Sequence, residues 1–592
     1  MYYPPLVVIL SFIITDCHHQ RGGTAISWKL KKNAQRLLAG ERGTVFKEWG
    51  GRITVALVFP NSYSLGMSNL GFQSVYNLFN SIDDVVCERA FLPDRVEMKE
   101  FAESGPRLFS LETQRPLDAF DIVAFSIPFE EDFLHIPEIL RLAAIPPFSS
   151  ERGDGHPLVM AGGVALSLNP EPIADFIDLF AIGEGESFLP AFVDALKEGS
   201  EAERGALLEE MTALEGVYVP SLYRVEYDGP VIREVTPISG APERVRKAAT
   251  LDLDAWRTPQ SYVTTEATEF GHTFLIEVER GCGRGCRFCA AGFIYLPMRE
   301  RNIGAVKESI ASGGAITGKV GLVGPAVSEY GELKELVRSV IDGGNRITLS
   351  SLRMDVLDGE LLDLLKVGGY RTITIAPEAG SQRLRDVINK GISDAEIMKT
   401  VARVKEAGFA NMKLYFLVGL PTEGPEDVEA IIDLTRRVRT TLKQGGDISI
   451  SVNPFIPKSW TPFQWAPYEH MKMLEGKLSA IKKGCGSMKG VQVKCYSPRM
   501  GYLQTILSRG DRRVASAIDR NVGRSAGQLL KSVADPDRYV YRERSYDEIL
   551  PWDILDQGIT KEYLWKEYER ALKGQVTPPC DVGRCFRCGV CS

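Results

Sequence analysis

The sequence predicts an α/β protein in three parts: a Rossmann-like domain, a partial (βα)6 barrel of the TIM type, and a small helical C-terminal region with a cysteine cluster. Two stretches of strand-like apolar runs alternate with helical segments, a pattern typical of parallel sheets. At 592 residues the chain is too long for a single hydrophobic core. We expect an N-terminal extension over residues 1–45, the Rossmann-like domain over 46–215, a linker over 216–265, the partial barrel over 266–500 and the C-terminal region over 501–592.

The first βα series starts at residue 52. RITVALVFP (52–60) is apolar along most of its length and predicts a buried parallel strand, and a helix is expected over 64–80. Each later strand is followed by a glycine-rich or polar turn, at the edge where an open α/β sheet binds its ligands. These later strands are expected at 120–128, 157–163 and 178–186.

The second βα series is the most regular part of the sequence. Six strand-like runs alternate with helical segments such as DAEIMKTVARVKEA (394–407), which predicts a parallel sheet curled into a partial barrel. The six strands are expected at 273–278, 319–324, 346–353, 371–378, 412–420 and 447–455. Beyond residue 500 a helical pattern is clearest over 549–574.

Composition narrows the class of protein. The chain is 44% hydrophobic and 25% charged, as an ordinary folded protein is, and its formal charge of -7 argues against nucleic-acid binding by bulk charge. Eleven cysteines are too few for a disulfide scaffold, and seven of them lie in two clusters, which predicts metal binding in a reducing compartment. The apolar run 5–14 is shorter than the roughly 20 residues that span a bilayer and lacks the features of a signal peptide. We therefore expect a cytoplasmic protein with no membrane partner.

The first cysteine cluster stands in ERGCGRGCRFCAAG (279–292), directly after an apolar strand. Cys282, Cys286 and Cys289 are spaced so that one glycine-rich loop can hold three corners of a 4Fe-4S cluster, which leaves the fourth iron open to a substrate. Phe288 can pack on such a cluster and limit solvent. Zinc is the alternative, but it needs a fourth ligand, and the nearest histidines are His272 and His470.

The CxxxCxxC motif after the first of six βα strands resembles the radical S-adenosylmethionine (SAM) superfamily over residues 270 to 460. The resemblance implies that Cys282, Cys286 and Cys289 are the catalytic cluster ligands. It also implies that the open iron binds SAM, and that one electron cleaves SAM to methionine and a 5'-deoxyadenosyl radical. The electron donor would be of the flavodoxin or ferredoxin type.

Other strand ends fit the same resemblance. GPAVSEY (324–330) stands where the family contacts the SAM amino group, although the usual GGE is absent, and PEAGS (377–381) resembles the family's motif after the fourth strand. VGLPTEG (418–424) resembles the turn near the adenine, with Thr422 where glycine is usual. Taken singly, each stretch is as well explained as a turn or a helix cap. The SAM-binding residues implied are Gly324, Ser351, Arg353, Glu378 and Gly419.

The N-terminal series resembles the cobalamin-binding domain that precedes the barrel in many members of the superfamily. Ser126, Gly162 and Gly163 fall where that domain contacts the nucleotide tail of cobalamin, and GEGE (183–186) is common in such proteins. The loop that ligates cobalt would fall on NSYSLG (61–66), where a tyrosine, Tyr63, replaces the histidine. The resemblance therefore implies either cobalamin bound without a lower protein ligand or a domain that has lost the cofactor.

The second cysteine cluster ends the sequence as CDVGRCFRCGVCS (580–592). Four cysteines with this spacing can bind a second 4Fe-4S cluster or a zinc ion, and the closely repeated CxxC favours the cluster. A disordered, reactive tail is the third interpretation. The ligands are Cys580, Cys585, Cys588 and Cys591. The isolated cysteines, expected to be packed thiols, are Cys17, Cys87, Cys485 and Cys495.

These patterns predict a radical SAM enzyme, with cobalamin-dependent methylation of carbon as the implied reaction on an unknown small molecule or RNA. A methylthiotransferase-like RNA-modifying enzyme is the alternative, because 453–465 (NPFIPKSWTPFQW) resembles the barrel of those enzymes. Against it stand the absence of their N-terminal three-cysteine domain and of a basic RNA-binding stripe. A non-catalytic iron–sulfur electron carrier is a third hypothesis, but a carrier gains nothing from an open iron.

Overall fold

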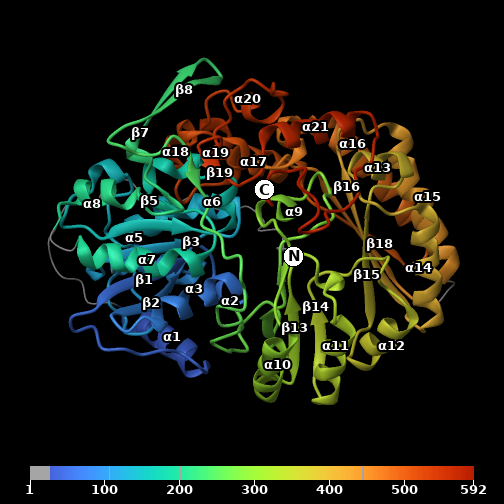
Figure 1. Cartoon of the computed structure of the whole chain (residues 1–592), viewed down its shortest axis with the longest axis horizontal. Coiled ribbons are helices and arrows are strands. Elements are labelled where there is room, and N and C mark those ends of the chain that lie inside the picture. Colours follow the sequence, from blue (N-terminus) through green and yellow to red (C-terminus); the bar gives the residue numbers. More distant parts are fainter. Residues whose placement is uncertain (1–26, 106, 200–201, 443–445, 592) are drawn as a thin grey trace.

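The computed structural model describes residues 27–105, 107–199, 202–442 and 446–591. Figure 1 shows two α/β halves side by side, the first in blue to cyan and the second in green to orange, with the C-terminal segment in red across the top. Buried apolar side chains from both halves form one continuous core. Within these described ranges no helix is long and apolar enough to cross a membrane. The apolar run 5–14 lies outside the described residues.

A six-stranded sheet forms the first half. Its order is β2-β1-β3-β4-β5-β6, and all neighbours are parallel except the last pair. The strands are β1 (Ile53–Phe59), β2 (Val85–Phe91), β3 (Ile122–Ser126), β4 (Leu158–Gly162), β5 (Leu179–Ala181) and β6 (Val217–Tyr218). The four predicted strands are confirmed, whereas β2 was not predicted. The sequence of β2 contains Glu88 and Arg89, yet both are buried. Arg89 forms ion pairs with Glu41 and Glu112, and Glu88 accepts hydrogen bonds from Trp49 and Ser110.

The helix expected over 64–80 is two helices in the structure. α2 (Tyr63–Met67) ends at Ser68, and α3 (Leu70–Ser81) begins one residue later. The side chain of Asn69 accepts a hydrogen bond from the Phe72 amide and caps α3, so the chain changes direction there. α3 packs against β2 and α7 (Gly185–Glu198), on one face of the sheet.

Seven parallel strands form the second half. The six predicted strands are present, but they lie in two sheets, β10-β13-β14 and β15-β16-β17-β18, instead of one curled sheet. Their bounds are β10 (Phe274–Glu277), β13 (Lys319–Val323), β14 (Arg346–Leu349), β15 (Thr372–Glu378), β16 (Asn411–Val418), β17 (Ile448–Pro454) and β18 (Val491–Cys495). The last strand was not predicted, because VQVKC is short and alternates polar with apolar residues.

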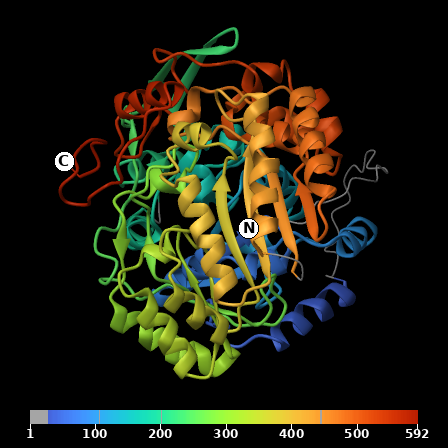
Figure 2. The same cartoon turned by 90° about the vertical axis from the view of Figure 1, so that its right-hand side faces the viewer.

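Helices cover the outer side of these strands, as Figure 2 shows for the second sheet. In α11 the residues at positions 333, 336, 337 and 340 are buried, which is the spacing of one helix face. The main covering helices are α10 (Ile303–Thr317), α11 (Leu333–Asp342), α12 (Gly359–Val367), α14 (Asp394–Glu406), α15 (Pro425–Leu442) and α16 (Met471–Gly486).

The carboxyl ends of the strands in both halves face each other. Lys458, after β17, binds Glu130, after β3, at 2.5 Å. The Tyr496 hydroxyl, after β18, donates to Glu131 at 2.7 Å. Since parallel α/β sheets bind ligands at this edge, both halves present their ligand-binding edges to one interface.

The segment 549–574 of the C-terminal region is less helical than expected. Over 549–574 only α21 (Lys561–Leu572) is a helix, and the preceding segment contains turns and the short strand β19 (Leu555–Asp556). Pro551 and Gly558 interrupt the helical pattern there. β19 pairs with β9 (Val245–Arg246) of the expected linker, which also contains the hairpin β7 (Tyr223–Asp228) and β8 (Val231–Pro237).

Candidate functional site

The three cysteines of the first cluster lie in a loop at the carboxyl end of β10. The loop begins after β11 (Glu279–Arg280), which pairs antiparallel with β12 (Arg299–Glu300). Gly281 and Gly285 have φ angles of 88° and 66°, a conformation that favours glycine. A Cβ on Gly281 would also lie 2.4 Å from the Tyr295 carbonyl oxygen. The local fold therefore requires glycines where the sequence has them.

The thiols of this loop lie near one another and are half-buried. Burial raises the pKa of Cys282 to about 12, and its neighbours Cys286 and Cys289 add to that shift. Burial also raises the pKa of Cys289. In the described ranges no three Cys, His, Asp or Glu side chains converge closely enough to hold a metal ion as they stand. Three sulfurs on one loop nevertheless have the donor chemistry that a 4Fe-4S cluster requires.

Lys390 contacts both the end of β15 and the cysteine loop. Glu378 is the last residue of β15, follows a shift in the strand register and has a φ of 64°. Its carboxylate lies 3.4 Å from the Lys390 ammonium, which stands 5.9 Å from the centre of the Phe288 ring. Burial lowers the pKa of Lys390, but Glu378 and Cys286 outweigh burial and raise it above its ordinary value. Two predicted site residues, Glu378 and Phe288, thus meet at a lysine that the sequence analysis did not single out.

Glu329 connects two other strand ends with the same loop. Its carboxylate binds Arg353, a predicted SAM ligand, at 3.0 Å, and Arg284, inside the cysteine loop, at 2.5 Å. The Ser351 hydroxyl accepts a hydrogen bond from the Val327 amide. The turns after β13 and β14 are therefore joined to each other and to the cysteines. Glu329 lies within GPAVSEY (324–330), but no local pattern indicates that it pairs with two arginines.

Glu279 supplies a carboxyl group at the turn that lacks the GGE motif. Its Oε1 accepts a hydrogen bond from the Ala326 amide at 2.6 Å, and it lies 2.1 Å from where a Cβ on Gly324 would be. Among the described residues its Oε2 has no hydrogen-bond partner. Burial raises the pKa of Glu279 to about 8. Gly324, a predicted SAM ligand, is thus the residue whose lack of a side chain lets this acid approach.

The turn after β16 has its own network. Gly419 has a φ of 82°, and its amide donates to the carboxylate of Glu423, which Lys477 binds at 2.7 Å. Thr422 adopts a φ of 66°, although it carries a side chain, and Arg383 binds its carbonyl and hydroxyl. Together with Glu378 it is one of the non-glycine residues in this strained conformation at strand ends, where functional sites concentrate.

The residues expected to contact cobalamin lie at the facing edge of the first sheet. Ser126 ends β3 and is paired in register with Gly162 of β4. Gly163 has a φ of 126°, and a Cβ there would lie 2.4 Å from the Ile127 carbonyl oxygen, so the chain's own packing requires this glycine. The structure therefore places these three residues at neighbouring strand ends, whereas their contact with cobalamin stays a prediction.

The loop 61–66 is joined to other buried polar groups. The Tyr63 hydroxyl donates to Glu41 at 2.6 Å, so this side chain is already engaged. The Asn61 amide donates to Oδ1 of Asp132 at 2.8 Å, while Oδ2 of Asp132 has no hydrogen-bond partner in the part of the chain described. Burial raises the pKa of Asp132 to about 7. A free, buried carboxyl oxygen thus stands at this edge, and no histidine is present in the loop.

The GEGE motif binds the strand that precedes the cysteines. Arg280, two residues before Cys282, binds Glu184 at 2.9 Å and Glu186 at 2.8 Å, and it also binds Glu277. Burial alone would raise the pKa of Glu184, but Arg280 and Arg299 hold it below its usual range. The first half of the molecule therefore fixes the start of the cysteine loop, a role that the sequence did not reveal.

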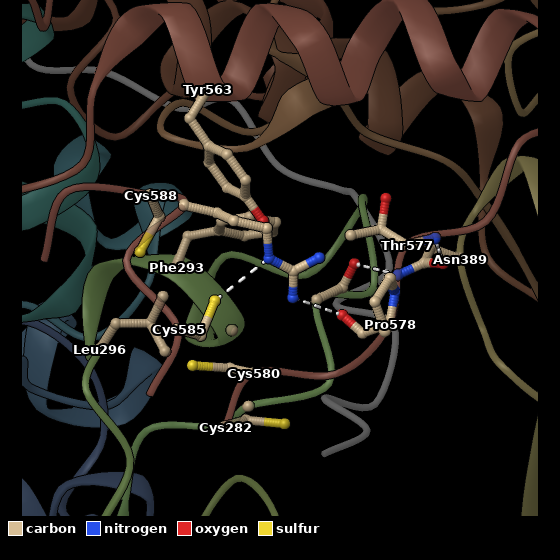
Figure 3. Close-up of a pocket in the computed structure, with 14 residues that line it drawn as sticks. Cys282, Phe293, Leu296, Asn389, Tyr563, Thr577, Pro578, Cys580, Cys585 and Cys588 are labelled. Atoms are coloured by element: carbon tan, nitrogen blue, oxygen red, sulfur yellow. Dashed lines mark hydrogen bonds between the residues drawn. The ribbon is translucent and has the colours of Figure 1, made fainter. Parts of the chain in front are cut away.

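The C-terminal cysteines lie beside the first cluster. The Cys580 amide donates to the Gly283 carbonyl at 2.7 Å. Figure 3 shows Cys282, Cys580, Cys585 and Cys588 around one pocket. The Arg587 Nε donates to the Cys585 sulfur at 3.1 Å and, with the backbone, lowers the pKa of that thiol. Of the isolated cysteines, Cys87 and Cys485 are buried and Cys495 is half-buried, whereas Cys17 lies outside the described residues.

Comparisons with known proteins agree with this site. Residues 71–220 match the family described as "Radical SAM proteins, N-terminal", and residues 276–435 match the "Radical SAM superfamily". "Uncharacterized protein MJ0966" of Methanocaldococcus jannaschii is 30% identical over 469 residues, which cover 78% of this chain and 90% of that protein. A tRNA-2-methylthio-N(6)-dimethylallyladenosine synthase of Anaplasma marginale is 28% identical over 28% of this chain and 40% of its own length.

Among solved structures, the cobalamin-dependent S-adenosylmethionine radical enzyme OxsB with aqua-cobalamin bound superposes with a TM-score of 0.43 and 16% identity. The match covers 65% of this chain, which spans about half (52%) of the OxsB chain. The family matches lie in both halves of the molecule, and the second of them contains all three cysteines of the loop. The chain therefore belongs to the radical SAM superfamily, whose members bind a 4Fe-4S cluster and S-adenosylmethionine.

Proposed function

We propose that the protein reductively cleaves SAM to methionine and a 5'-deoxyadenosyl radical, with Cys282, Cys286 and Cys289 as the ligands of its 4Fe-4S cluster. The radical would abstract hydrogen from an unactivated C–H bond of the substrate. The observation that carries the proposal is the arrangement around Cys286, whose thiol is within electrostatic reach of both Lys390 and Arg353. Paired acids and bases beside three thiols suit a ligand that carries both an ammonium and a carboxylate.

The side chains around the cysteine loop have distinct binding roles in this proposal. Lys390 and Arg353 supply cations for the SAM carboxylate, while Glu378 and the free oxygen of Glu279 are acceptors for its amino group. When bound, the cluster supplies the electron that breaks the sulfonium bond. The protein binds, orients and shields, and the cofactors carry the difficult chemistry. The residues proposed for the ribose and adenine are Ser351 and Gly419.

We further propose that cobalamin binds between the two halves and that the reaction is methyl transfer to carbon. Support comes from Ser126, Gly162 and Gly163 at one edge, and from the unpartnered carboxyl oxygen of Asp132 in the segment that follows β3. Because Tyr63 donates its hydroxyl to Glu41, cobalamin would bind without a lower protein ligand. We also propose that an external protein of the flavodoxin or ferredoxin type reduces the 4Fe-4S cluster, and that the protein is cytoplasmic.

The test uses protein purified without oxygen, reconstituted with iron and sulfide, and incubated with cobalamin. We expect stoichiometric corrinoid after gel filtration, and deoxyadenosine release from SAM after addition of dithionite. Cys286→Ala should abolish deoxyadenosine release, because a cluster held by two cysteines is lost; Cys495→Ala, a half-buried thiol outside both clusters, is the control. Release by the Cys286 variant at the wild-type rate would refute the cluster assignment. Release without bound corrinoid would remove only the cobalamin proposal.

A methylthiotransferase-like activity on RNA is the second candidate, favoured by the similarity to the Anaplasma marginale synthase over 28% of this chain. The affinity of a protein for RNA falls steeply as the salt concentration rises, because binding releases counterions from the phosphates and added salt opposes that release. Binding of bulk tRNA across a salt titration therefore tests this candidate, and an absence of salt-dependent binding would exclude it. The third candidate, an electron carrier, predicts no SAM cleavage at all.

A further inference from the structure

A backbone hydrogen bond joins the segments that contain the two cysteine clusters. Gly283 directly follows Cys282, and its carbonyl oxygen accepts the Cys580 amide at 2.7 Å. A Cβ on Gly283 would lie 3.3 Å from the Cys580 carbonyl oxygen and 3.5 Å from the Cys580 Cβ, so the two segments are in close contact and a side chain there would crowd them. The contact joins residues that are far apart in the sequence, and it places a ligand of each cluster on either side of one backbone group.

Buried interactions hold the C-terminal segment in this position. The Arg287 side chain is fully buried, binds Glu567 of α21 at 3.0 Å and donates to the Gln575 carbonyl at 2.6 Å. Asn389 bridges the other side: its Oδ1 accepts the Thr577 amide, and its Nδ2 donates to the Gly285 carbonyl. Both sets of contacts begin within the cysteine loop. The segment is therefore a docked part of the fold, which argues against a disordered reactive tail.

The four C-terminal thiols supply the donor set of a closed metal site, although their sulfurs do not converge on one point as they stand. Cys588 is 6% exposed, and Cys580, Cys585 and Cys588 line the pocket that also contains Cys282. Four cysteines can satisfy all four irons of a 4Fe-4S cluster, which leaves none open to a substrate and suits electron transfer. A hydrogen bond to a ligand sulfur, such as the one from Arg587 to Cys585, is one of the means by which proteins adjust cluster potentials.

The outer side of this segment faces solvent. Phe586 is 60% exposed and Val582 is 48% exposed, and both flank Cys585 in the sequence. A reductant in solution can thus reach the C-terminal cysteines directly.

We propose that Cys580, Cys585, Cys588 and Cys591 bind a second 4Fe-4S cluster that passes electrons to the cluster held by the cysteine loop. An external one-electron donor of the flavodoxin class reduces the second cluster from the 2+ to the 1+ state. That cluster then returns to 2+ as the first cluster is reduced to 1+, so one electron enters and one is delivered. The electron-relay role rests on the proposed function, whereas the presence of a second cluster does not.

Metal content tests the site itself, with the full-length chain reconstituted with iron and sulfide. The wild-type protein should contain about eight irons and no zinc, and the double variant Cys588→Ser/Cys591→Ser, which leaves only two cysteines at this site, should contain about four. Cys495→Ser is the matched control and should retain about eight. After reduction by dithionite, the paramagnetic resonance spectrum of the wild type should show two interacting clusters, and the double variant should show one isolated signal. About four irons with one zinc in the wild type would overturn the proposal.

Electron delivery tests the relay. With a reduced flavodoxin as the donor, SAM cleavage by the double variant Cys588→Ser/Cys591→Ser should fall by about tenfold, whereas cleavage driven by dithionite should fall much less. Equal losses with both reductants, or no loss with flavodoxin, would overturn the relay. Absence of SAM cleavage in the wild type would instead refute the proposed function, while the iron and resonance measurements would still decide whether the second cluster exists.

Discussion

The guanidinium of Arg280 binds the carboxylate of Glu186 at 2.8 Å and so joins the N-terminal sheet to the start of the cysteine loop. Glu186 belongs to α7, which follows β5, and Arg280 belongs to β11, two residues before Cys282. Both side chains are nearly buried, at 8% and 12% exposure. The position of the loop therefore depends on the half of the molecule that does not contain it.

Replacement of Arg280 by alanine should destabilise the protein and weaken cluster assembly. The substitution leaves Glu184, Glu186 and Glu277 buried without their shared cation, a change that costs about 3–5 kcal/mol in comparable buried pairs. Denaturant unfolding and iron content after reconstitution measure the two effects. Arg233→Ala is the control, because that side chain is 69% exposed and its unfolding free energy should change little. Unchanged stability and iron content in the Arg280 variant would contradict the structural coupling.

Replacement of Glu378 by glutamine should weaken SAM binding without loss of the cluster. The amide keeps the size of the side chain but removes the charge that Lys390 and the SAM amino group would share. We expect the dissociation constant for SAM to rise by about 10- to 100-fold, the loss of a hydrogen bond to a charged group being worth about 1.5–3 kcal/mol. Equilibrium binding to the reconstituted protein measures this change, with Glu396→Gln, at the N-terminus of α14, as control. Equal affinity of the wild type and the Glu378 variant would remove Glu378 from the site.

Asp132 should make the folded state less stable as the pH rises. Its pKa is raised from 3.8 to about 7 in the folded protein, chiefly by burial. Between those two values the unfolded chain loses the proton while the folded chain keeps it, so the folded state binds more protons and its stability falls with pH. Asp132→Asn abolishes this contribution and should stabilise the protein at pH 8 by about 2–4 kcal/mol.

Unfolding free energies of the wild type and Asp132→Asn, measured without added cofactor from pH 5 to pH 8, give the comparison. The other titratable groups that face Asp132 are Glu130, Glu131 and His135, and they remain in both proteins. Their effects therefore cancel in the difference between the two curves. Parallel curves across this range would show that Asp132 is ionised in the folded protein.

Local sequence patterns predicted most strands because buried parallel strands are apolar along their length. They missed β2, where Glu88 and Arg89 look polar in sequence but are buried, since Arg89 has acidic partners that only the fold provides. They also could not show that β14 and β15 belong to different sheets, because strand pairing is decided by packing between distant segments.

The candidate site, too, could be predicted from the sequence only where its features are local. Cys282 and its partners were identifiable because a metal motif is local, with fixed spacing. Lys390 was not, because its role depends on the distance to Glu378 and to the cysteines after folding. The contact of Cys580 with Gly283 joins two local motifs across the fold, and no periodicity or spacing encodes it.

Replacement of Arg287 by lysine should release the C-terminal segment. The Arg287 guanidinium reaches Glu567, the Gln575 carbonyl and the Val387 carbonyl at once, whereas an ammonium concentrates its donors at one point. Each buried acceptor left without a donor costs about 1–3 kcal/mol, so local unfolding of residues 575–591 should become frequent. Limited proteolysis with mass spectrometry should show faster cleavage in this segment. Arg584→Lys, with an 84% exposed side chain in the same segment, should be cleaved like the wild type. Equal cleavage of all three proteins would mean that Arg287 does not hold the segment against the cysteine loop.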